Sequence, residues 1–579
     1  FFEDTNEQPQ KSKECFPSQA RSYVLELLVR KTRRHKRHFE CLDGVRALAF
    51  LWVCGYHALV FNLGVDTQFG GKKTKVKSNH YDYYRFERPL LNLMACGQLG
   101  VTLFLALSGF LVAHALTKSL QKNERFAVTR FYWSRFWRIW PSLAVAAVAT
   151  QPLALWARGD PLRQWRDECG DGVGFARYWV QQVDLLLNLR TDPFAVGCWA
   201  TNLYWSCALE FQCYLLLPLF VVLHQRFAYK KLAVSLAATL VALVLLFRAV
   251  AVAARYAEAR PYVGQMWYLA SLHRDWKIYA RPWYRGSEYL VGVLAYFAYL
   301  ELLPLQFSAS RHQDDGRRQD DRRRPSLSLC PHDDDDDDRE AELMTRALLS
   351  QRPAVTLDGV DASDPDVVVV DGHPDARHHR NNPFLPDDDD ADSDDAEKGM
   401  VAAVAAYDDE RWRLQLLSAL ETLALSGFAG FAWCRYQAAR AAYNHGTHDN
   451  FHQWLATHAL ETKVAATFEP FFVASSAAAL MAASCGGGLH AHVALRLCRA
   501  ALSHALWFPV ATLSFTAYLM SGVAICFIKA RPQLAADGGF LGRLLCLVLF
   551  ALVLGFALSL AVERPAMRFS RLVLAFLAS

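Results

Sequence analysis

The sequence has few charged residues and none of the short motifs that bind nucleotides, dinucleotides or zinc. Only 21% of its 579 residues are charged, whereas 53% are hydrophobic. It contains no G-x-x-x-x-G-K-[ST] loop, no G-x-G-x-x-G loop and no zinc-type C-x-x-C pair. A basic face interleaved with aromatic residues, which is typical of nucleic-acid binding, is also missing. Nucleotide hydrolysis, Rossmann chemistry and nucleic-acid binding therefore have no support, and we expect no metal site.

A polar, strongly acidic segment covers residues 307–410 and separates two apolar regions. It contains the aspartate runs Asp333–Asp338 and Asp387–Asp390. Such a segment cannot bury enough apolar surface to offset the entropy of the chain, so its composition predicts disorder. Carboxylate runs also bind divalent cations, but a solvated spacer is the interpretation we favour.

The apolar stretches decide the fold class. A bilayer core about 30 Å thick needs about 20 mostly apolar helical residues to cross it. A single stretch of this kind is also consistent with a buried core helix, but no soluble fold buries so many. The sequence therefore predicts an all-α polytopic membrane protein with about ten transmembrane helices and one disordered acidic loop. The predicted stretches are Leu42–Asn62, Leu99–Leu116, Pro141–Trp156, Leu203–Leu223, Leu232–Val252, Tyr289–Leu305, Leu414–Trp433, Ala465–Ala483, Leu506–Ile528 and Leu541–Val562.

Basic residues beside these stretches predict how the chain is oriented in the membrane. The run Arg30–Arg37 precedes the first stretch, and Lys230 and Lys231 follow the fourth. We therefore expect both ends of this multi-pass protein in the cytosol. Because the chain opens with Phe1, it is expected to be a piece of a longer protein.

Four segments follow from this division. Residues 1–40 form a basic cytosolic segment, and residues 41–306 form the first part of the membrane domain, with about six helices. The disordered acidic insert occupies residues 307–410. The second part of the membrane domain, with about four helices, occupies residues 411–579.

Charged side chains within apolar stretches are costly, and by default they mark function or a need for pairing. In the first stretch, Arg46 precedes His57 by eleven residues. At 100° per residue this spacing returns to within about 20° of the starting face, with a rise of about 16 Å. One helix face thus presents a guanidinium and, roughly half a membrane deeper, an imidazole. A hydrogen-bonded packing residue remains the alternative for His57.

Arg135 and Arg138 lie in the stretch FYWSRFWRIWP, three residues apart and on one helix face. Two guanidiniums beside aromatic rings suit phosphate groups, which arginine binds in bidentate fashion. A membrane anchor with an aromatic belt accounts for this piece equally well. Glu210 and Gln212 lie among apolar residues in the fourth stretch, and Glu421 lies in the seventh.

Six motifs, taken in order, resemble the acyltransferase 3 family of integral-membrane O-acyltransferases with ten-helix architecture. They are LDGVRALAFLWVCGYHA, LGVTLFLALSGFLVAHAL, FYWSRFWRIWP, LYWSCALEFQCYLLLPLF, LSFTAYLMSGVAI and LAVERPAMRFSR. The resemblance covers roughly residues 41–306 and 412–570. The fragments CLDGVR and YARPWYRGSEYLVGVLAYF further resemble the eukaryotic nose-resistant-to-fluoxetine-like branch.

The resemblance implies roles for individual residues. Arg46 and His57 match the Arg-x10-His pair of the family's first helix, so His57 is the expected catalytic base and Arg46 is expected near the donor. Arg135 and Arg138 match the Arg-x-x-Arg motif linked with the coenzyme A donor. Glu210 matches the carboxylate of the W-S-x-x-x-E pattern and is the third expected catalytic residue.

The implied reaction moves an acyl group, most simply acetyl, from acyl-coenzyme A to a hydroxyl of a lipid, a glycan or another acceptor. The enzyme is then an acyltransferase for groups other than aminoacyl groups. Acyl-coenzyme A is a co-substrate, and no permanently bound cofactor is expected. The other expected partners are the hydroxyl-bearing acceptor and the lipid bilayer.

The sequence departs from the family pattern at two positions. Thr102 stands where many members have Asp, and Ser521 occupies the place of a common His. The loss of that second imidazole argues against a mechanism that needs two. Two other functions stay open: a polytopic transporter with an intramembrane Arg/His/Glu relay, and a membrane scaffold without chemistry.

Overall fold

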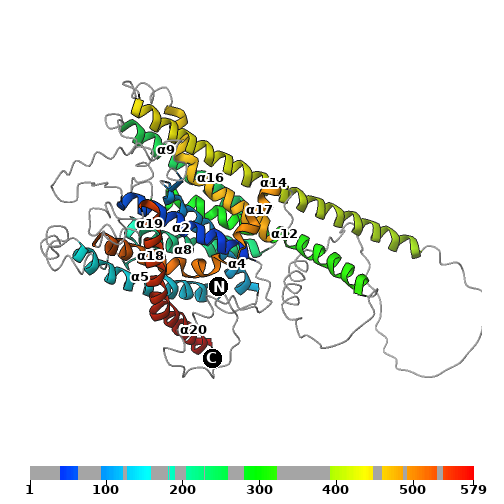
Figure 1. The fold of residues 1–579 in the computed structure, drawn as a ribbon. Helices are drawn as coiled ribbons and strands as arrows, with labels where there is room; N and C mark the ends of the chain where they lie inside the picture. The colour runs from blue at the N-terminus through cyan, green and yellow to red at the C-terminus, as the bar shows by residue number, and fades with distance from the viewer. Residues whose placement is uncertain are drawn as a thin grey trace, which may run out of the picture. The chain divides into compact units, whose positions relative to one another are not determined.

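The computed structural model describes the helical body of the chain. The described residues are 39–62, 93–94, 96–121, 127–157, 180, 183–189, 204–226, 229–258, 280–321, 391–447, 459–486, 492–530 and 539–578. All regular structure in these ranges is helical, which confirms the predicted all-α class (Figure 1).

A helix coincides with each of the ten predicted stretches. These ten helices are α2 (Glu40–Asn62), α4 (Gly100–Gln121), α5 (Ala127–Ala157), α8 (Trp205–Gln225), α9 (Lys230–Glu258), α12 (Pro282–Asp321), α14 (Ala391–Thr447), α16 (Ala459–Gly486), α18 (Trp507–Ala530) and α19 (Gly539–Leu558). The sequence did not predict the two short helices α17 (Val493–Leu502) and α20 (Arg564–Ala578). A π-helical turn, η9 (Ser559–Glu563), joins α19 to α20.

Seven stretches of described helix are long and apolar enough to cross a membrane. They lie in α4, α8, α9, α14, α16 and α18, and in the run from α19 into α20. Among the residues that the structure describes in full, α2, α5 and α12 have no stretch that qualifies. Each of the three carries arginine inside the bundle, and such charges lower the mean hydropathy of a helix. The predicted count of ten spans is thus not confirmed, although the ten helices are present.

The chain divides into two compact units. One comprises residues Phe1–Arg317 and Leu417–Ser579, and the other comprises Arg318–Leu416. Within the segment predicted to be disordered, the structure has helix at residues 307–321 and 391–410, whereas 322–390 lie outside the described residues. Alanine, which has the highest helix propensity, occupies six of the twenty positions in residues 391–410 and favours helix there. The four predicted segment boundaries stay a prediction.

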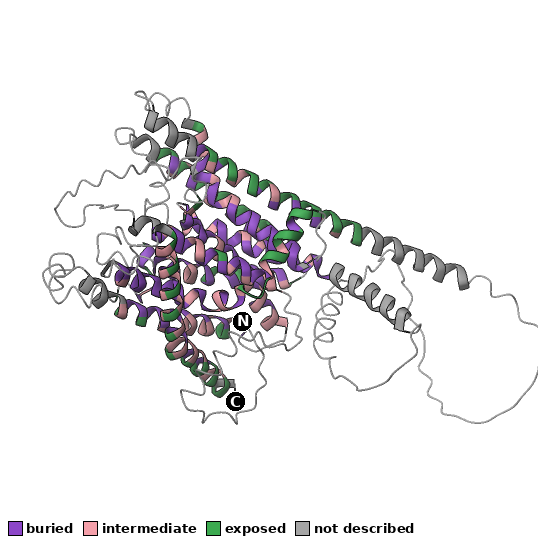
Figure 2. Ribbon diagram, viewed as in Figure 1, coloured by how far each residue is buried: buried purple, intermediate pink, exposed green. Residues whose placement is uncertain are grey.

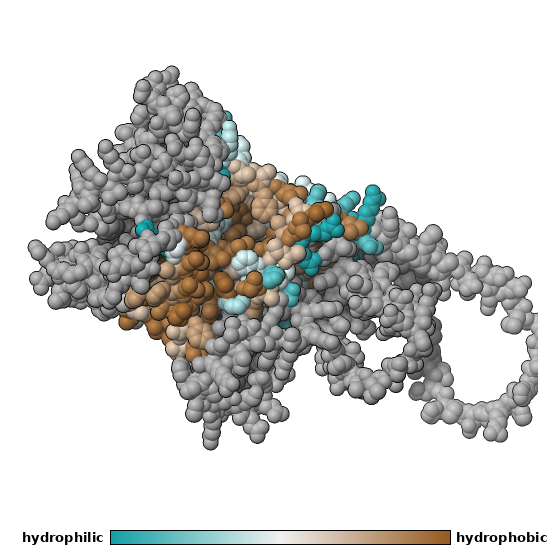
Figure 3. Space-filling view, viewed as in Figure 1, coloured by the Kyte–Doolittle hydropathy of each residue, from teal (hydrophilic) through white to brown (hydrophobic). Residues whose placement is uncertain are grey.

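The core of the larger unit lies around α2, α4 and α18. Helix α18 packs against α2, α5 and α19, while α4 packs against α2, α8 and α16. Buried residues gather along these helices in Figure 2. Helix α9 instead exposes large apolar side chains, among them Leu246 and Val250. In Figure 3, hydrophobic residues gather over the middle of the coloured surface. A surface that faces lipid requires such residues.

Two glycines let α4 and α12 approach closely. A Cβ added at Gly109 would collide with the backbone oxygen of Tyr289, and one added at Gly292 would collide with the backbone oxygen of Ala106. Small residues of this kind permit backbone contact between helices in membranes. The contact fixes α12 against α4, and both helices carry polar residues of the interior.

Candidate active site

Four of the predicted site residues come together inside the larger unit. Arg46 on α2 interacts electrostatically with Glu210 on α8, with Asp43 on its own helix and with the like charge of Arg138 on α5. Arg135, one turn before Arg138, interacts with the same carboxylate of Glu210. Three helices that are distant in sequence thus supply three guanidiniums around the carboxylate of Glu210, and the carboxylate of Asp43 lies beside Arg46.

Glu210 is held by two hydroxyl groups. Ser108 on α4 donates a hydrogen bond to the Oε1 atom of Glu210 at 2.6 Å, and the hydroxyl of Tyr214 donates a second, short hydrogen bond to the same oxygen. The Ser108 and Tyr214 oxygens are 3.2 Å apart. Hydrogen bonds to a charged acceptor are stronger than neutral ones, so this arrangement holds the carboxylate in place.

Arg135 is buried, with 5% of its surface exposed, and lies beside two aromatic rings that also contact each other. Its guanidinium is 5.8 Å from the ring centroid of Phe131 and 5.7 Å from that of Tyr214. These distances allow cation–π attraction, which stabilises a desolvated guanidinium. Tyr214 therefore joins the two halves of the site, since its ring faces Arg135 and its hydroxyl binds Glu210.

The sequence analysis missed Ser108 and Tyr214. A sequence signal for Tyr214 exists, because it follows Glu210 by four residues and so lies on the same face of α8. No comparable signal exists for Ser108, which is separated from Glu210 by 102 positions and reaches it only through the packing of α4 on α8.

His57 lies on α2 well away from this cluster. It is buried, with 5% of its surface exposed, and its ring centroid is 5.9 Å from that of Tyr56. The helical rise between Arg46 and His57 amounts to about 16 Å along the axis. The structure thus groups Arg46 with Glu210, Arg135 and Arg138, and sets His57 about three turns further along α2.

Other polar residues noted in the sequence have structural partners. The hydroxyl of Ser521 donates to the backbone oxygen of Tyr518 at 2.7 Å, one turn earlier on α18. Gln212 and Asn188 exchange two side-chain hydrogen bonds, of 2.8 and 2.9 Å. Glu421 is buried on α14. Among the described residues, no group of three or more His, Cys, Asp or Glu side chains is arranged to hold a metal ion.

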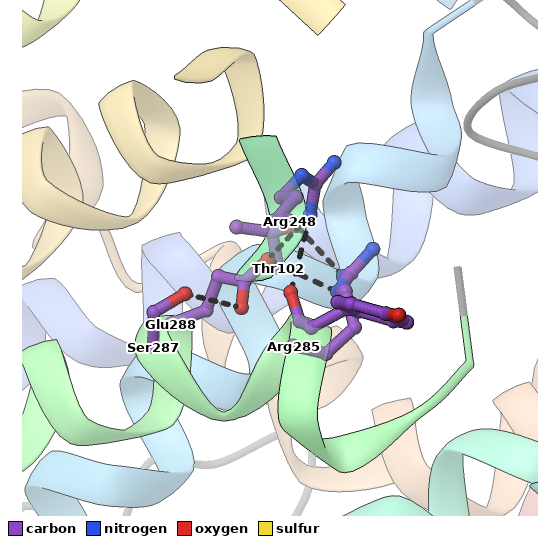
Figure 4. Close-up of polar contacts among 6 residues, drawn as sticks. Thr102, Arg248, Arg285, Ser287 and Glu288 are labelled. Carbon is purple, nitrogen blue, oxygen red and sulfur yellow. Dashed lines mark hydrogen bonds and ion pairs between the residues drawn. The ribbon is translucent and has the colours of Figure 1, made fainter. Parts of the chain in front are cut away.

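A second charged cluster lies deep in the same unit, and the sequence analysis did not predict it (Figure 4). The Nε atom of Arg285 on α12 is 3.0 Å from the Oε1 atom of Glu288, and the Nη1 atom of Arg248 on α9 is 3.6 Å from that same oxygen. Arg285 also donates to the hydroxyl of Thr102 at 2.9 Å. Ser287 donates to the other oxygen of Glu288 at 3.1 Å.

This second cluster joins three helices. Arg248, Arg285 and Glu288 are at most 3% exposed, so each depends on its partners to offset the loss of water. Thr102 precedes Ser108 by six residues on α4, which places the second cluster about 9 Å from the first along that helix. Helix α4 therefore connects two polar layers of the interior.

The fold and its seven apolar stretches define a helical membrane protein, and its interior holds two clusters of charged side chains. Residues 39–309, which contain α2, α4, α5, α8, α9 and most of α12, match the family model of an acyltransferase domain, Acyl_transf_3. The resemblance to the acyltransferase 3 family seen in the sequence is confirmed by this match over residues 39–309.

One curated relative resembles the chain over a limited region. The chain is 26% identical over 198 residues to the peptidoglycan O-acetyltransferase OatA of Listeria monocytogenes. The similar region covers 34% of this chain and 26% of the relative, so the chain spans about a quarter of the length of the protein it matches. No solved structure matches the chain.

Proposed function

We propose that the protein is a membrane O-acyltransferase that moves an acyl group, most simply acetyl, from acyl-coenzyme A to a hydroxyl of a lipid or carbohydrate. The observation that carries the proposal is the convergence of Arg46, Arg135, Arg138 and Glu210 from three helices, within the part of the chain that matches an acyltransferase domain.

The donor is bound through its phosphates. Arg135 and Arg138 present two guanidiniums on one face of α5, and arginine binds phosphate oxygens in bidentate fashion. Arg46 adds a third positive charge beside them. Glu210 limits the excess of positive charge, because its carboxylate interacts with both Arg46 and Arg135.

His57 is the proposed base. The acceptor oxygen attacks the thioester carbonyl while His57 takes the hydroxyl proton. An oxygen–carbon bond forms, the carbon–sulfur bond breaks, and the proton leaves with the thiol of coenzyme A. A base of this kind contributes typically 10²–10⁴-fold to the rate. The distance of about 16 Å along α2 between Arg46 and His57 suits such a donor, because a long pantetheine arm separates its thioester from its phosphates.

The basic helix ends support a cytosolic donor side. Lys118 lies in the last turn of α4, Arg226 follows α8, and Lys230 begins α9. Given the antiparallel connections of these helices, all three lie at the end of the bundle where α2 begins. Positive residues favour the cytosolic side, so the amino and carboxyl ends are proposed to be cytosolic.

Acyl transfer in reconstituted membranes tests the proposed function. The purified protein is incubated in nanodiscs with labelled acetyl-coenzyme A and with candidate lipid and glycan acceptors. Label in an acceptor with the original protein, and its loss in the His57→Ala variant, are expected. If no acceptor gains label and the protein instead moves a solute across proteoliposomes, the acyltransferase proposal is wrong and a transporter is the better description.

A further inference from the structure

Two short helices, α17 and α20, lie at the same end of the bundle. Helix α17 directly precedes α18, while α20 follows α19 through η9. Because α18 and α19 pack side by side as consecutive antiparallel helices, the start of α18 and the end of α19 share one end. The amino end of α2 lies there too, since a Cβ added at Gly44 would collide with the backbone oxygen of Leu502.

Helix α20 has an exposed apolar face beside a basic one. Phe569, Leu572 and Phe576 recur at spacings of three and four residues, and 49%, 69% and 79% of their surfaces are exposed. Arg568 and Arg571 are also exposed and occupy the adjoining face of the helix. Ala566 and Ser570, on the remaining side, are buried.

Helix α17 repeats this arrangement. Leu495 is buried on the side that packs against α2. Val493 and Leu497, on the opposite side, are 60% and 66% exposed, and the exposed Arg496 lies next to them. Two helices that are separate in sequence thus present the same combination of exposed leucine and arginine at one end of the protein.

The length of the last helical run indicates that α20 leaves the hydrocarbon. The run Leu541–Phe576 has 36 residues. At 1.5 Å per residue this is about 54 Å, whereas the hydrocarbon core of a bilayer is about 30 Å thick. The final part of the run, which contains Arg568 and Arg571, therefore reaches the headgroup region.

We propose that α17 and α20 lie in the headgroup region of one leaflet and bind anionic phospholipids. Leu497, Leu572 and Phe576 contact the boundary between headgroups and acyl chains, while Arg496, Arg568 and Arg571 contact lipid phosphates. Amphipathic helices with arginine on the polar face bind membranes in this way, and more strongly when the lipids are anionic. The proposal does not depend on the chemistry of the active site.

The lipid-binding helix contacts the helix of the proposed donor site. Helix α20 packs against α5, and the ring centroids of Phe569 and Trp137 are 5.0 Å apart. Trp137 directly precedes Arg138. The leaflet that supplies the anionic lipids is therefore the one on the same side of the membrane as Arg135 and Arg138.

Hydrogen exchange in two lipid mixtures tests the proposal. The full chain is placed in nanodiscs of phosphatidylcholine alone and of an equimolar mixture with phosphatidylglycerol. Amide exchange in residues 493–502 and 564–578 is expected to slow roughly tenfold in the anionic mixture. The difference should shrink at high salt, which screens charges at the surface. Equal exchange in both mixtures would overturn the proposal.

Matched arginine variants separate binding of anionic lipid from a general effect of charge. Arg568→Gln combined with Arg571→Gln should remove most of the lipid-dependent protection of α20. Arg543→Gln, at the other end of the α19 run, should leave it unchanged. Arg571→Gln alone serves if the double variant does not fold. Protection that rises with protein concentration and not with lipid charge would show that a second copy covers these helices, and would also overturn the proposal.

Discussion

The hydroxyl of Tyr214 donates a hydrogen bond to Glu210, one turn earlier on α8. The ring of the same tyrosine lies 5.7 Å from the guanidinium of Arg135, so one side chain contacts both the acidic and the basic part of the proposed site. The hydroxyl of Tyr214 can be removed alone or together with the ring, so variants at this position can distinguish the contact with Glu210 from the contact with Arg135.

Replacing Tyr214 by Phe should lower kcat/KM roughly tenfold or more, because Glu210 loses one charge-assisted hydrogen bond of about 1.5–3 kcal/mol. Replacing it by Leu should in addition raise the KM for the acyl donor, since the ring that stabilises Arg135 is lost. Steady-state kinetics with both variants measure this difference. Tyr132→Phe, which loses a hydrogen bond to the backbone oxygen of Leu215 on the outside of the site, is the control. Equal KM values in the Phe and Leu variants would contradict the role of the ring.

Replacing Arg135 and Arg138 together by Gln should weaken the affinity for the acyl donor more than that for the acceptor. Both guanidiniums are proposed to bind coenzyme A phosphates. Lys at both positions should restore only part of the affinity, because it keeps the charge but not the bidentate geometry. Binding of acyl-coenzyme A to membranes with matched protein levels provides the measurement. Arg130→Gln, an exposed arginine on the same helix, is the control. An unchanged donor affinity would contradict the role in donor binding and would favour the alternative that Arg135 and Arg138 anchor the helix at the membrane surface.

Replacing His57 by Ala should reduce acyl transfer by on the order of 10² or more, while donor binding persists. The reason is that His57 is the proposed base and lies about three turns along α2 from Arg46, which is grouped with the arginines proposed to bind the donor. Activity and donor affinity are measured in parallel on the same preparation. His224→Gln is the control for the loss of a buried imidazole. The ring of His224 is buried and stacks on that of Phe297, with the ring centroids 3.9 Å apart. Turnover close to that of the original protein would rule out His57 as the base.

Replacing Glu288 by Gln should lower the free energy of unfolding by about 3–5 kcal/mol, because two buried guanidiniums lose their shared carboxylate. The matched control is Glu301→Gln. This substitution removes the partly exposed ion pair with Lys230, in which the Nζ and Oε1 atoms are 3.6 Å apart. It should lower the free energy of unfolding by at most about 1 kcal/mol. Thermal unfolding of the purified proteins measures both changes.

A second substitution tests the same cluster by rescue. In the Glu288→Gln background, Thr102→Asp should recover part of the lost stability, because position 102 already lies within hydrogen-bonding distance of Arg285, at 2.9 Å. If Thr102→Asp destabilises the Glu288→Gln protein further, the interpretation that the buried Arg285 depends on a carboxylate partner is wrong.

The sequence by itself determined the helices and the residues that share one helix. Long apolar stretches have no other stable form in a bilayer than a helix, so all ten positions could be read directly. The spacing of Arg46 and His57, and that of Arg135 and Arg138, is likewise a property of a single helix. Glu210 stood out as a carboxylate within an apolar stretch, and the family resemblance then assigned it a catalytic role. The short helices α17 and α20 escaped prediction because each is too short to give a membrane signal.

Only the tertiary structure decided which of these residues meet. Ser108 reaches Glu210, and Arg285 reaches Thr102, across 102 and 183 positions of sequence. Hydropathy cannot supply such pairings, because a buried arginine lowers the apolar signal of its helix without indicating its partner. The approach of α4 and α12 through Gly109 and Gly292 is what brings Thr102 and Arg285 together. Charge pairing in a low-dielectric interior is a property of the packed bundle, and so it becomes visible only once the helices are assembled.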